Sequence, residues 1–298
     1  MKRVIVNTWQ KALVYKNNEF RRVLNAGNYW IWNEKVTVVD IREQLDQFAN
    51  LELLARNSSL HEVLQFIEVG DQKIVLQLEN GNLKAVLTTG LYAFWKEYAG
   101  YTFVEANLSE TFIREDISRV ILQNRMLAAF VRTSNIENYE AALLFVDGKF
   151  EGKLAAGLHY WWKNEKSVQI VRADVRMQQL EINGQEILTK DKAALRINAW
   201  AQFRVADIEK AVLQNAAYDK QLYILLQLAL RSVVATLGFD ELLEKRERLS
   251  DMMLDQLREH ATALGVEIAN FGIRDIILSG EVRAIMNEVL VADKKAQA

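Results

Sequence analysis

The chain of 298 residues contains no cysteine and no proline. Without cysteine, the protein forms no disulfide, holds no metal through thiolates and has no cysteine nucleophile. Average usage would give roughly 15 prolines in a chain of this length, and the sequence offers no physical reason for their absence. The missing cysteine is the informative absence, because it excludes three kinds of site.

Long apolar segments are also absent. One of the longest apolar runs, AALLFV at 141–146, falls far short of the ~20 residues that a helix needs to cross a bilayer. Near the N-terminus, Asn7, Gln10 and Lys11 interrupt the apolar stretch that a signal peptide requires. We therefore expect no transmembrane segment and no signal peptide in this sequence, and a soluble protein of the cytoplasm.

A strong charge of one sign is lacking, since the formal net charge is −2 and no basic stripe is visible. This balance gives no reason to expect nucleic acid as a partner. His61, His159 and His260 have no clustered partners, and the sequence contains no HExxH, G-x-S-x-G, P-loop or Rossmann glycine pattern. We predict no catalytic residue, no metal site, no cofactor and no enzymatic activity.

One phrase occurs three times, as NAGNYWIWN (25–33), TTGLYAFWK (88–96) and AAGLHYWWK (155–163). Each copy has a glycine, then a tyrosine or histidine two residues later, then a tryptophan five residues after the glycine. The glycines are Gly27, Gly90 and Gly157, and the tryptophans are Trp32, Trp95 and Trp162. Self-similarity of this kind indicates a repeated structural unit.

Turn residues precede each phrase at the same distance. They are Asn17-Asn18, Asn80-Gly81 and Asp147-Gly148. Asn-Gly and Asp-Gly suit a two-residue hairpin loop, whose central residues both need positive φ, and Asn-Asn is a weaker form of the same signal. A strand-like stretch follows each tryptophan. Each unit therefore reads as a hairpin, a glycine turn, an aromatic strand and a return strand.

The repeated aromatic side chains have two interpretations. They fill the small core of each unit, or they form a surface for sugars or lipid headgroups. The repetition favours the core, because a core is needed in every copy whereas a ligand site is usually needed once. We predict that Trp32, Trp95 and Trp162 are mostly buried, each within its own unit.

Helical patterns connect the units and dominate the C-terminal half. Residues 57–69 and 113–131 read as helical connectors, with Leu60, Val63, Leu64 and Ile67 on one face of the first. The stretch 194–205 alternates strictly between apolar and polar residues, which predicts a half-buried strand. Three helices follow, capped by Asp207, by Asp219 and by Asp240 or Ser250, and the third ends at Gly265. A strand at 266–278 and a last helix from about Glu281 complete the pattern.

The C-terminal half resembles the stomatin/prohibitin/flotillin (SPFH, or band 7) domain. The resemblance rests on ILTKDKAALRINAWAQFRVADIEKAV and on LLQLALRSVVATLGFDELLEKRERLSDMMLDQLREHATALGVEIANFGIRDIIL. ALLFVDGKFEGKLAAGLHYWW matches the place where that domain begins, so the similarity covers about 140–290. The chain is most similar to bacterial stomatin-like slipins, and its upstream copies resemble the N-terminal extension of a slipin subgroup.

The resemblance implies an α+β fold. We expect a β-rich repeat with a helical connector at 1–68, a second at 69–135, an SPFH/band 7-like domain of antiparallel sheet and helices at 136–278, and at 279–298 a helix that begins a coiled coil. It also implies a non-enzymatic, oligomerising scaffold, peripheral at the inner face of the membrane, that organises membrane patches or partners such as membrane proteases. The alternative is a lipid- or small-ligand-binding module that uses the aromatic repeats.

Two apolar stripes are the candidates for self-association. We expect the chain to form a homo-oligomer through them, weakly at this chain length and more strongly in a longer form, with a membrane surface or membrane protein as a further partner. The candidate residues are Leu249, Met253, Leu257 and Leu264 in one helix, and Val282, Ile285, Met286, Val289 and Leu290 in the last.

Overall fold

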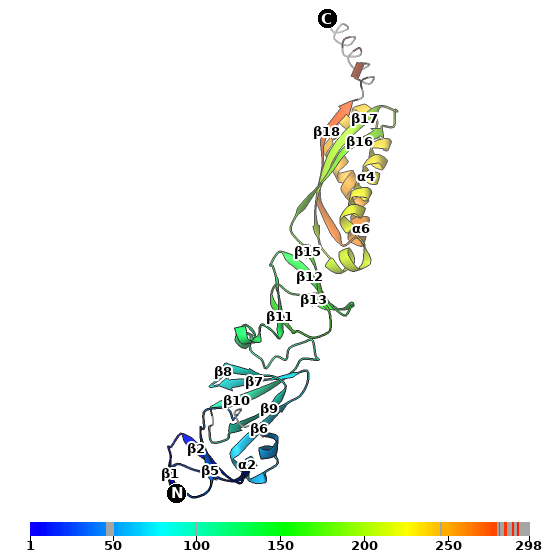
Figure 1. The fold of residues 1–298 in the computed structure, drawn as a ribbon. Coiled ribbons are helices and arrows are strands. Elements are labelled where there is room, and N and C mark those ends of the chain that lie inside the picture. Colours follow the sequence, from blue (N-terminus) through cyan, green and yellow to red (C-terminus); the bar gives the residue numbers. More distant parts are fainter. Residues whose placement is uncertain are drawn as a thin grey trace. The chain divides into compact units, whose positions relative to one another are not determined.

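The computed structural model describes residues 1–45, 51–98, 100–244 and 246–278, and after these residues 280, 283, 284, 288 and 291. The chain divides into two compact units (Figure 1). Unit 1 comprises residues 1–133 and 160–166, and unit 2 comprises 134–159 and 167–298. The boundary thus falls inside the third copy of the repeated phrase.

Three repeats of five strands occupy residues 2–174. The first has β1 (Lys2–Val6), β2 (Gln10–Lys16), β3 (Glu19–Leu24), β4 (Gly27–Ile31) and β5 (Lys35–Asp40). The second has β6 (Leu64–Val69), β7 (Lys73–Glu79), β8 (Asn82–Leu87), β9 (Gly90–Trp95) and β10 (Tyr101–Asn107). The third has β11 (Val131–Ile136), β12 (Glu140–Val146), β13 (Lys149–Leu154), β14 (Gly157–Trp162) and β15 (Val168–Asp174).

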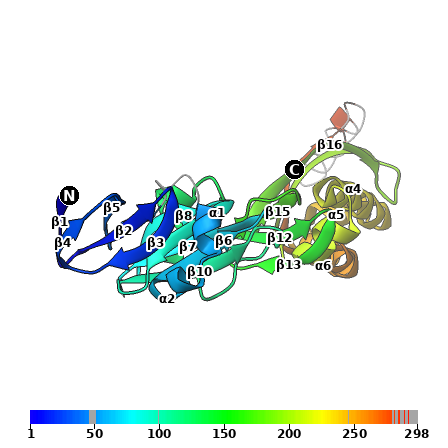
Figure 2. The same ribbon diagram turned by 60° about the horizontal axis from the view of Figure 1, so that its bottom comes forward.

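The strands pair in the same way in every repeat. The first and fourth strands form a two-stranded sheet, and the third, second and fifth form a three-stranded sheet in that order. Figure 2 shows the three-stranded sheet of the second repeat, β8, β7 and β10, side by side. The same strand pairing thus occurs three times, with one more strand at the start of each unit than the sequence pattern indicated.

The hairpin turns also coincide. Both central residues of each loop have positive φ, as a type I′ turn requires. The φ values are 53° and 64° at Asn17-Asn18, 51° and 82° at Asn80-Gly81, and 49° and 77° at Asp147-Gly148. The strand pairing shifts register at the same position before each turn, after Val14, Gln77 and Leu144. Local turn chemistry therefore fixes the same hairpin three times.

Short helices connect the repeats, and here the structure corrects the sequence pattern. They are α1 (Leu51–Ala55), α2 (Ser58–Val63), α3 (Arg119–Leu122) and the 3-10 turn η1 (Arg125–Leu127). The helix expected over 57–69 ends at Val63, and the rest of that segment is β6, which pairs with β9. Pairing with a strand far along the chain thus overrides the helical spacing of Leu60, Val63, Leu64 and Ile67.

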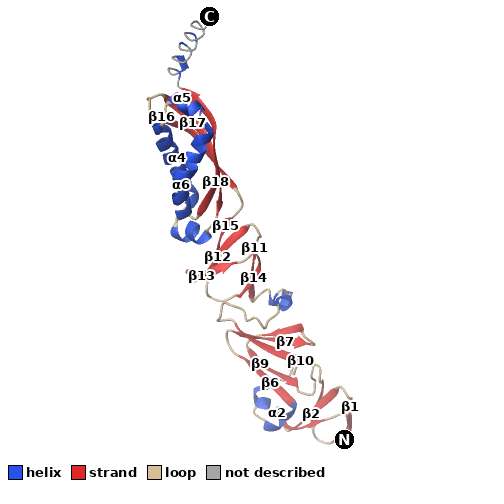
Figure 3. Cartoon of the chain, turned by 180° about the vertical axis from the view of Figure 1, so that it is seen from behind, coloured by secondary structure: helices blue, strands red, loops and turns tan. Residues whose placement is uncertain are grey.

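Unit 2 contains a sheet of three long strands with helices on one face (Figure 3). The sheet has the order β16 (Gln178–Leu188), β17 (Ala194–Val205) and β18 (Val266–Leu278), and all pairs are antiparallel. The helical elements are the π-helical turn η2 (Lys210–Gln214), α4 (Tyr218–Thr236), α5 (Phe239–Glu244) and α6 (Arg246–Ala263). The predicted mixture of antiparallel sheet and helices is confirmed.

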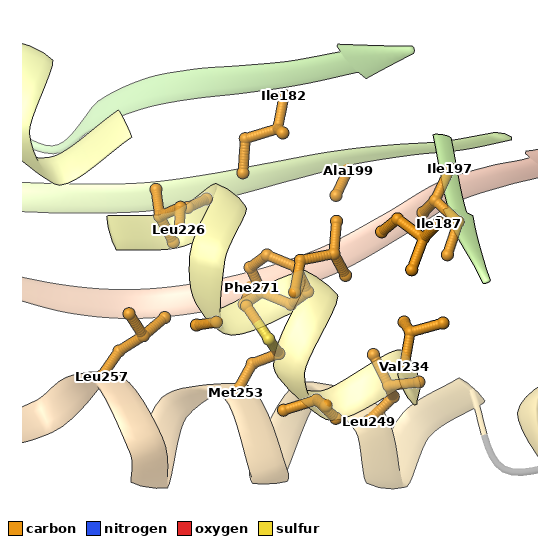
Figure 4. Packing of buried hydrophobic residues seen from close by; sticks show 14 of the residues in the cluster. Ile182, Ile187, Ile197, Ala199, Leu226, Val234, Leu249, Met253, Leu257 and Phe271 are labelled. Carbon is orange, nitrogen blue, oxygen red and sulfur yellow. The ribbon is translucent and has the colours of Figure 1, made fainter. Parts of the chain in front are cut away.

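Strand β17 explains why the helices cover only one face. Its alternate residues, Leu195, Ile197, Ala199, Ala201, Phe203 and Val205, are all buried. The close-up in Figure 4 shows Ile197 and Ala199 of this strand on the same core as Leu226 and Val234 of α4 and Met253 and Leu257 of α6. The period of two in the sequence therefore builds the core directly.

The helix α5 begins beside a carboxylate that caps it. The backbone N–H of Phe239 donates to Asp191 Oδ1 and Oδ2 at 3.2 and 3.1 Å, and Thr189 Oγ1 also donates to Asp191. The hydrogen bond from Thr189 is the main cause that holds the pKa of Asp191 below its usual value, and the bond from Phe239 adds to it. The ionised carboxylate is therefore the form that the fold favours.

Acid is expected to weaken unit 2 through this cap. Because the pKa of Asp191 is lowered by folding, its contribution is present above the unfolded pKa of about 3.9 and is lost as the pH falls through the lower, folded value. We expect Asp191→Asn to remove this part of the acid sensitivity, so that the urea midpoint changes less between pH 7 and pH 3. Asp251→Asn, at an exposed position of α6, is the control; an equal effect of both changes contradicts the assignment.

Candidate interaction surfaces

The repeated glycine phrase places an aromatic or histidine ring against its own backbone. Gly27, Gly90 and Gly157 have φ of 157°, 149° and 126°. The ring two residues later folds back over the glycine: a Cβ added to Gly27 would lie 3.2 Å from Tyr29, and one added to Gly90 would lie 3.7 Å from Tyr92. In these two copies the ring therefore packs beside the place where a side chain on the glycine would stand, whereas a Cβ added to Gly157 would have no atom within 4 Å.

The polar end of that ring bonds to the backbone just before the glycine. Tyr92 Oη donates to Thr88 O at 2.9 Å, and His159 Nε2 lies 2.7 Å from Ala155 O. A histidine thus takes the place of tyrosine in the third copy because both rings reach the same carbonyl. This satisfies the ring's polar atom inside the repeat, and it gives His159 a structural role.

The strand that carries the phrase has two faces with different neighbours. In the second repeat, Tyr92 and Phe94 point into a core with Val69, Val75 and Leu87 of the same repeat. The alternate residues, Ala93 and Trp95, lie instead in a core with Leu13, Leu45, Leu54, Leu60 and Leu64, in which Leu13 belongs to the first repeat. The two-stranded sheet of one repeat therefore packs on the three-stranded sheet of the preceding repeat.

The third copy follows the same rule within unit 1. Trp162 lies in a core with strand residues of the second repeat and with the connector that follows them. Those neighbours are Ile74, Leu76, Leu78, Ala106, Ile117, Leu122 and Leu127, and Val131 of the third repeat joins the same core. Trp95 and Trp162 are both 2% exposed, so their predicted burial is confirmed, but each fills the core of the preceding repeat and not of its own.

Trp32 breaks the prediction. Its side chain is 80% exposed, and Trp30 on the same face of β4 is 65% exposed. The residues at the equivalent positions, Ala93 with Trp95 and Tyr160 with Trp162, pack on a preceding repeat, whereas Trp30 and Trp32 are exposed. The expectation of a buried Trp32 is therefore wrong, because burial depends on a neighbour that the phrase itself does not encode.

The stripe predicted for self-association lies inside unit 2. Leu249, Met253, Leu257 and Leu264 are between 0% and 5% exposed and belong to the core between α4, α6 and the sheet. Figure 4 shows Leu249, Met253 and Leu257 pointing from α6 into that core. These side chains are not accessible to a second copy of the folded chain, which corrects this part of the prediction. The stripe of the last helix, Val282, Ile285, Met286, Val289 and Leu290, lies outside the described residues.

The face of the long sheet that carries no helix bears paired charges. Arg274 binds Glu181 with N–O distances down to 2.6 Å, Arg196 binds Glu186 at 2.7 Å, and Arg204 binds Glu267 at 2.7 Å. The hydrogen bond from Arg274 is the main cause that lowers the pKa of Glu181. Asn198 also donates to Asp275 across two neighbouring strands. These cross-strand pairs leave the face polar and electrically balanced.

A hollow of about 570 Å³ opens at one end of the long sheet. Its lining includes Ile187, Leu188, Leu195, Ile277 and Leu278, with Glu186 and Arg196 at its border. Two of these apolar side chains are exposed, Leu188 and Ile277. On α4, Ile224 and Leu228 are also exposed and stand one helical turn apart. These positions are part of the exposed apolar surface of unit 2 that another molecule could cover.

The described part of the chain offers no group of three or more side chains that could hold a metal ion. His61 Nε2 contacts the carbonyl of Ala55 and its ring packs on Phe66. Within the same part of the chain, no helix combines the length and the apolar character needed to cross a bilayer.

Comparison with known proteins decides the family. The sequence model of the SPFH domain / Band 7 family matches residues 134–298, which is more than half of the chain and begins where unit 2 begins. The chain belongs to this family. The family match and the α+β architecture confirm the predicted family and fold class, with the SPFH domain following two β repeats in the sequence. The predicted coiled coil stays a prediction.

The relatives include archaeal and animal proteins. An uncharacterized protein of Methanocaldococcus jannaschii is 29% identical over 163 residues, which are 55% of this chain and 81% of the relative. A stomatin homolog of Pyrococcus horikoshii is 32% identical over 164 residues, 55% of this chain and 60% of the relative. Stomatin-2 of Caenorhabditis elegans is 27% identical over 165 residues, 55% of this chain and 44% of the relative. The SPFH chain thus spans well under two thirds of both stomatins.

Proposed function

We propose that the protein is a non-enzymatic scaffold of the stomatin/slipin type, which self-assembles and organises membrane patches or partner proteins such as membrane proteases. The observation that carries the proposal is the match of the whole of 134–298 to the SPFH/Band 7 family, together with the similarity to stomatins. The two preceding β repeats fit a slipin with an N-terminal extension.

The surface of unit 2 supports assembly through a limited set of residues. The stripe of α6 is used in the core, and the open sheet face is balanced by its own ion pairs, which are worth little as exposed contacts. Exposed apolar side chains remain elsewhere, among them Ile224 and Leu228 on α4 and Leu188 and Ile277 at the end of the sheet. Apolar groups of this kind are covered when copies of a domain associate.

The repeats give less support to a ligand-binding module. Among their aromatic residues, Phe94, Trp95, Trp161 and Trp162 are buried, and the ring of Tyr92 is engaged with its own backbone. A sugar or lipid headgroup needs an exposed ring to stack on. The second and third copies of the phrase therefore act as core, as the repetition in the sequence suggested.

Mass photometry combined with liposome co-sedimentation tests the proposal, on this chain and on a form extended by any downstream coding sequence. We expect weak self-association here and larger assemblies in the longer form. Leu228→Asp and, in the segment that the sequence predicts to be the last helix, Ile285→Asp and Val289→Asp are expected to reduce assembly. Arg258→Ala, on the exposed side of α6, serves as the control. The proposal is contradicted if the longer form is strictly monomeric and does not co-sediment with liposomes.

A further inference from the structure

The first repeat presents an apolar face that the other two repeats bury. On β1 and β4, residues that are paired in register lie on one face, so that Arg3 stands beside Trp30 and Ile5 beside Asn28. Met1, Ile5, Trp30 and Trp32 on this side are 83%, 57%, 65% and 80% exposed. We call these four residues the Trp30/Trp32 face. The opposite side of the same two strands packs inside the repeat, through Val4, Val6, Tyr29 and Ile31.

The equivalent faces in the same chain show what such a surface contacts. In the second repeat, Leu64, Phe66, Ala93 and Trp95 cover the three-stranded sheet of the first. In the third, Val131, Tyr160 and Trp162 cover that of the second. In two of the three repeats, this face thus forms a contact with the neighbouring repeat in which a tryptophan is buried. By this equivalence the Trp30/Trp32 face is also suited to protein, and large exposed apolar patches generally mark such sites.

The three-stranded sheets of a second copy are not open to this face. Among the described residues, the outer face of each three-stranded sheet is already covered. In the first repeat Trp95 packs on the face around Leu13, and in the second Trp162 packs on the face around Leu76. In the third repeat Val205, Ile208 and Ala211 pack on the face around Leu143. A second copy therefore cannot accept Trp32 in the manner of the internal contacts. A second copy can instead present its own Trp30/Trp32 face, which carries two exposed tryptophans, and such a contact is two-fold and self-complementary.

The face is suited to contact with itself. Arg3 lies on it beside Trp30, so it carries both a guanidinium group and indole rings, which attract each other when they stack. Two indoles bury roughly 150–250 Å² each when covered. With Ile5 and Met1, each copy offers on the order of 500 Å², and the pair on the order of 1,000 Å², at the lower end of specific interfaces.

We propose that the Trp30/Trp32 face is a homodimer interface, in which the two-stranded sheets of two copies pack against each other around a two-fold axis. This contact lies in unit 1 and is independent of the assembly proposed for the SPFH domain. Its modest area predicts a weak dimer, with a dissociation constant in the micromolar range. The tryptophans are the expected centre of the binding energy.

Sedimentation velocity over a hundredfold concentration range tests the interface in the full chain. Trp32→Glu is expected to weaken the dimer by about tenfold or more, because it places a charge in the centre of the contact. Val120→Glu is the matched control, since Val120 on α3 is also 80% exposed. Circular dichroism checks that both variants fold. A wild-type chain that stays monomeric, or equal effects of the two variants, overturns the proposal.

The absence of cysteine allows a second, site-specific readout. Asn28→Cys places a single thiol on the Trp30/Trp32 side of β4, and a short bismaleimide is expected to link two copies there but not to link copies of Val120→Cys. Adding Trp32→Glu should abolish the link even if assembly through unit 2 persists, which separates this interface from the proposed function. Anionic vesicles of phosphatidylcholine and phosphatidylglycerol are the competing occupant: binding that depends on Trp32, without any cross-link in solution, overturns the dimer.

Discussion

Replacing Gly265 with alanine is expected to destabilise unit 2 more than any other single-methyl change considered for this chain. Gly265 follows α6 with a φ of 73°, a conformation that costs a residue with a side chain about 1–3 kcal/mol. A Cβ at this position would lie 2.4 Å from Asp207 O and 2.6 Å from Ala211 N, both backbone atoms that cannot turn away. With overpacking at about 1–3 kcal/mol, the loss should be roughly 2–6 kcal/mol.

The close approach has a reason in the fold. Gly265 O accepts hydrogen bonds from Ala206 N at 3.0 Å and from Asp207 N at 2.9 Å, so the end of α6 is bound directly to the chain that leaves β17. Breaking this contact should loosen β17 and β18 together. Hydrogen exchange of these two strands, read by mass spectrometry, measures the effect in unit 2 without interference from unit 1.

Two other glycines of unit 2 separate the two causes. Gly184 has a φ of 66° and no atom within 4 Å of an added Cβ, so Gly184→Ala should cost only the backbone strain. Gly238 has no positive φ, and the nearest atom to an added Cβ, Asp191 Oδ2, is 3.8 Å away. Gly238→Ala should therefore be close to neutral. If Gly265→Ala and Gly184→Ala lower the stability of unit 2 equally, the steric contact at Gly265 contributes nothing to the loss.

The features that sequence predicted well depend on neighbours close along the chain. Positive φ at Asn80-Gly81 and Asp147-Gly148 is a property of two residues and their flanking strands, and it gives the hairpin without any knowledge of the fold. The alternation of 194–205 likewise identifies β17, because the two faces of a strand differ in burial whatever covers them.

The features that sequence missed depend on distant partners. The strand β6 was read as the end of a helix because Leu60, Val63, Leu64 and Ile67 suit one helical face, and its strand partner β9 lies far downstream. The stripe of α6 was predicted as a self-association surface, because its apolar pattern shows that a neighbour covers it but not which neighbour. The structure places it against the domain's own sheet and α4, and so removes it from the candidate interfaces.

Truncation of the three repeated tryptophans is expected to give unequal results despite their shared phrase. Trp95→Ala and Trp162→Ala should each lower the free energy of unfolding of unit 1 by about 3–5 kcal/mol, the usual range for a buried aromatic residue. Trp32→Ala should change it by no more than about 0.5 kcal/mol, because the side chain is 80% exposed. Urea unfolding followed by circular dichroism, at a dilution where association is negligible, measures all three.

The size of the effect at Trp95 also tests how the repeats are joined. Its neighbours Leu13 and Leu60 belong to the first repeat and its connector, so Trp95→Ala should expose amides of β2 to hydrogen exchange, although β2 lies in another repeat. Trp95→Phe keeps an aromatic ring and removes an indole N–H that is buried without a hydrogen-bond partner among the described residues, so its cost should be smaller. If Trp95→Ala instead loosens only the second repeat, each tryptophan serves its own unit, and the equivalence that makes the exposed Trp32 a docking residue loses its basis.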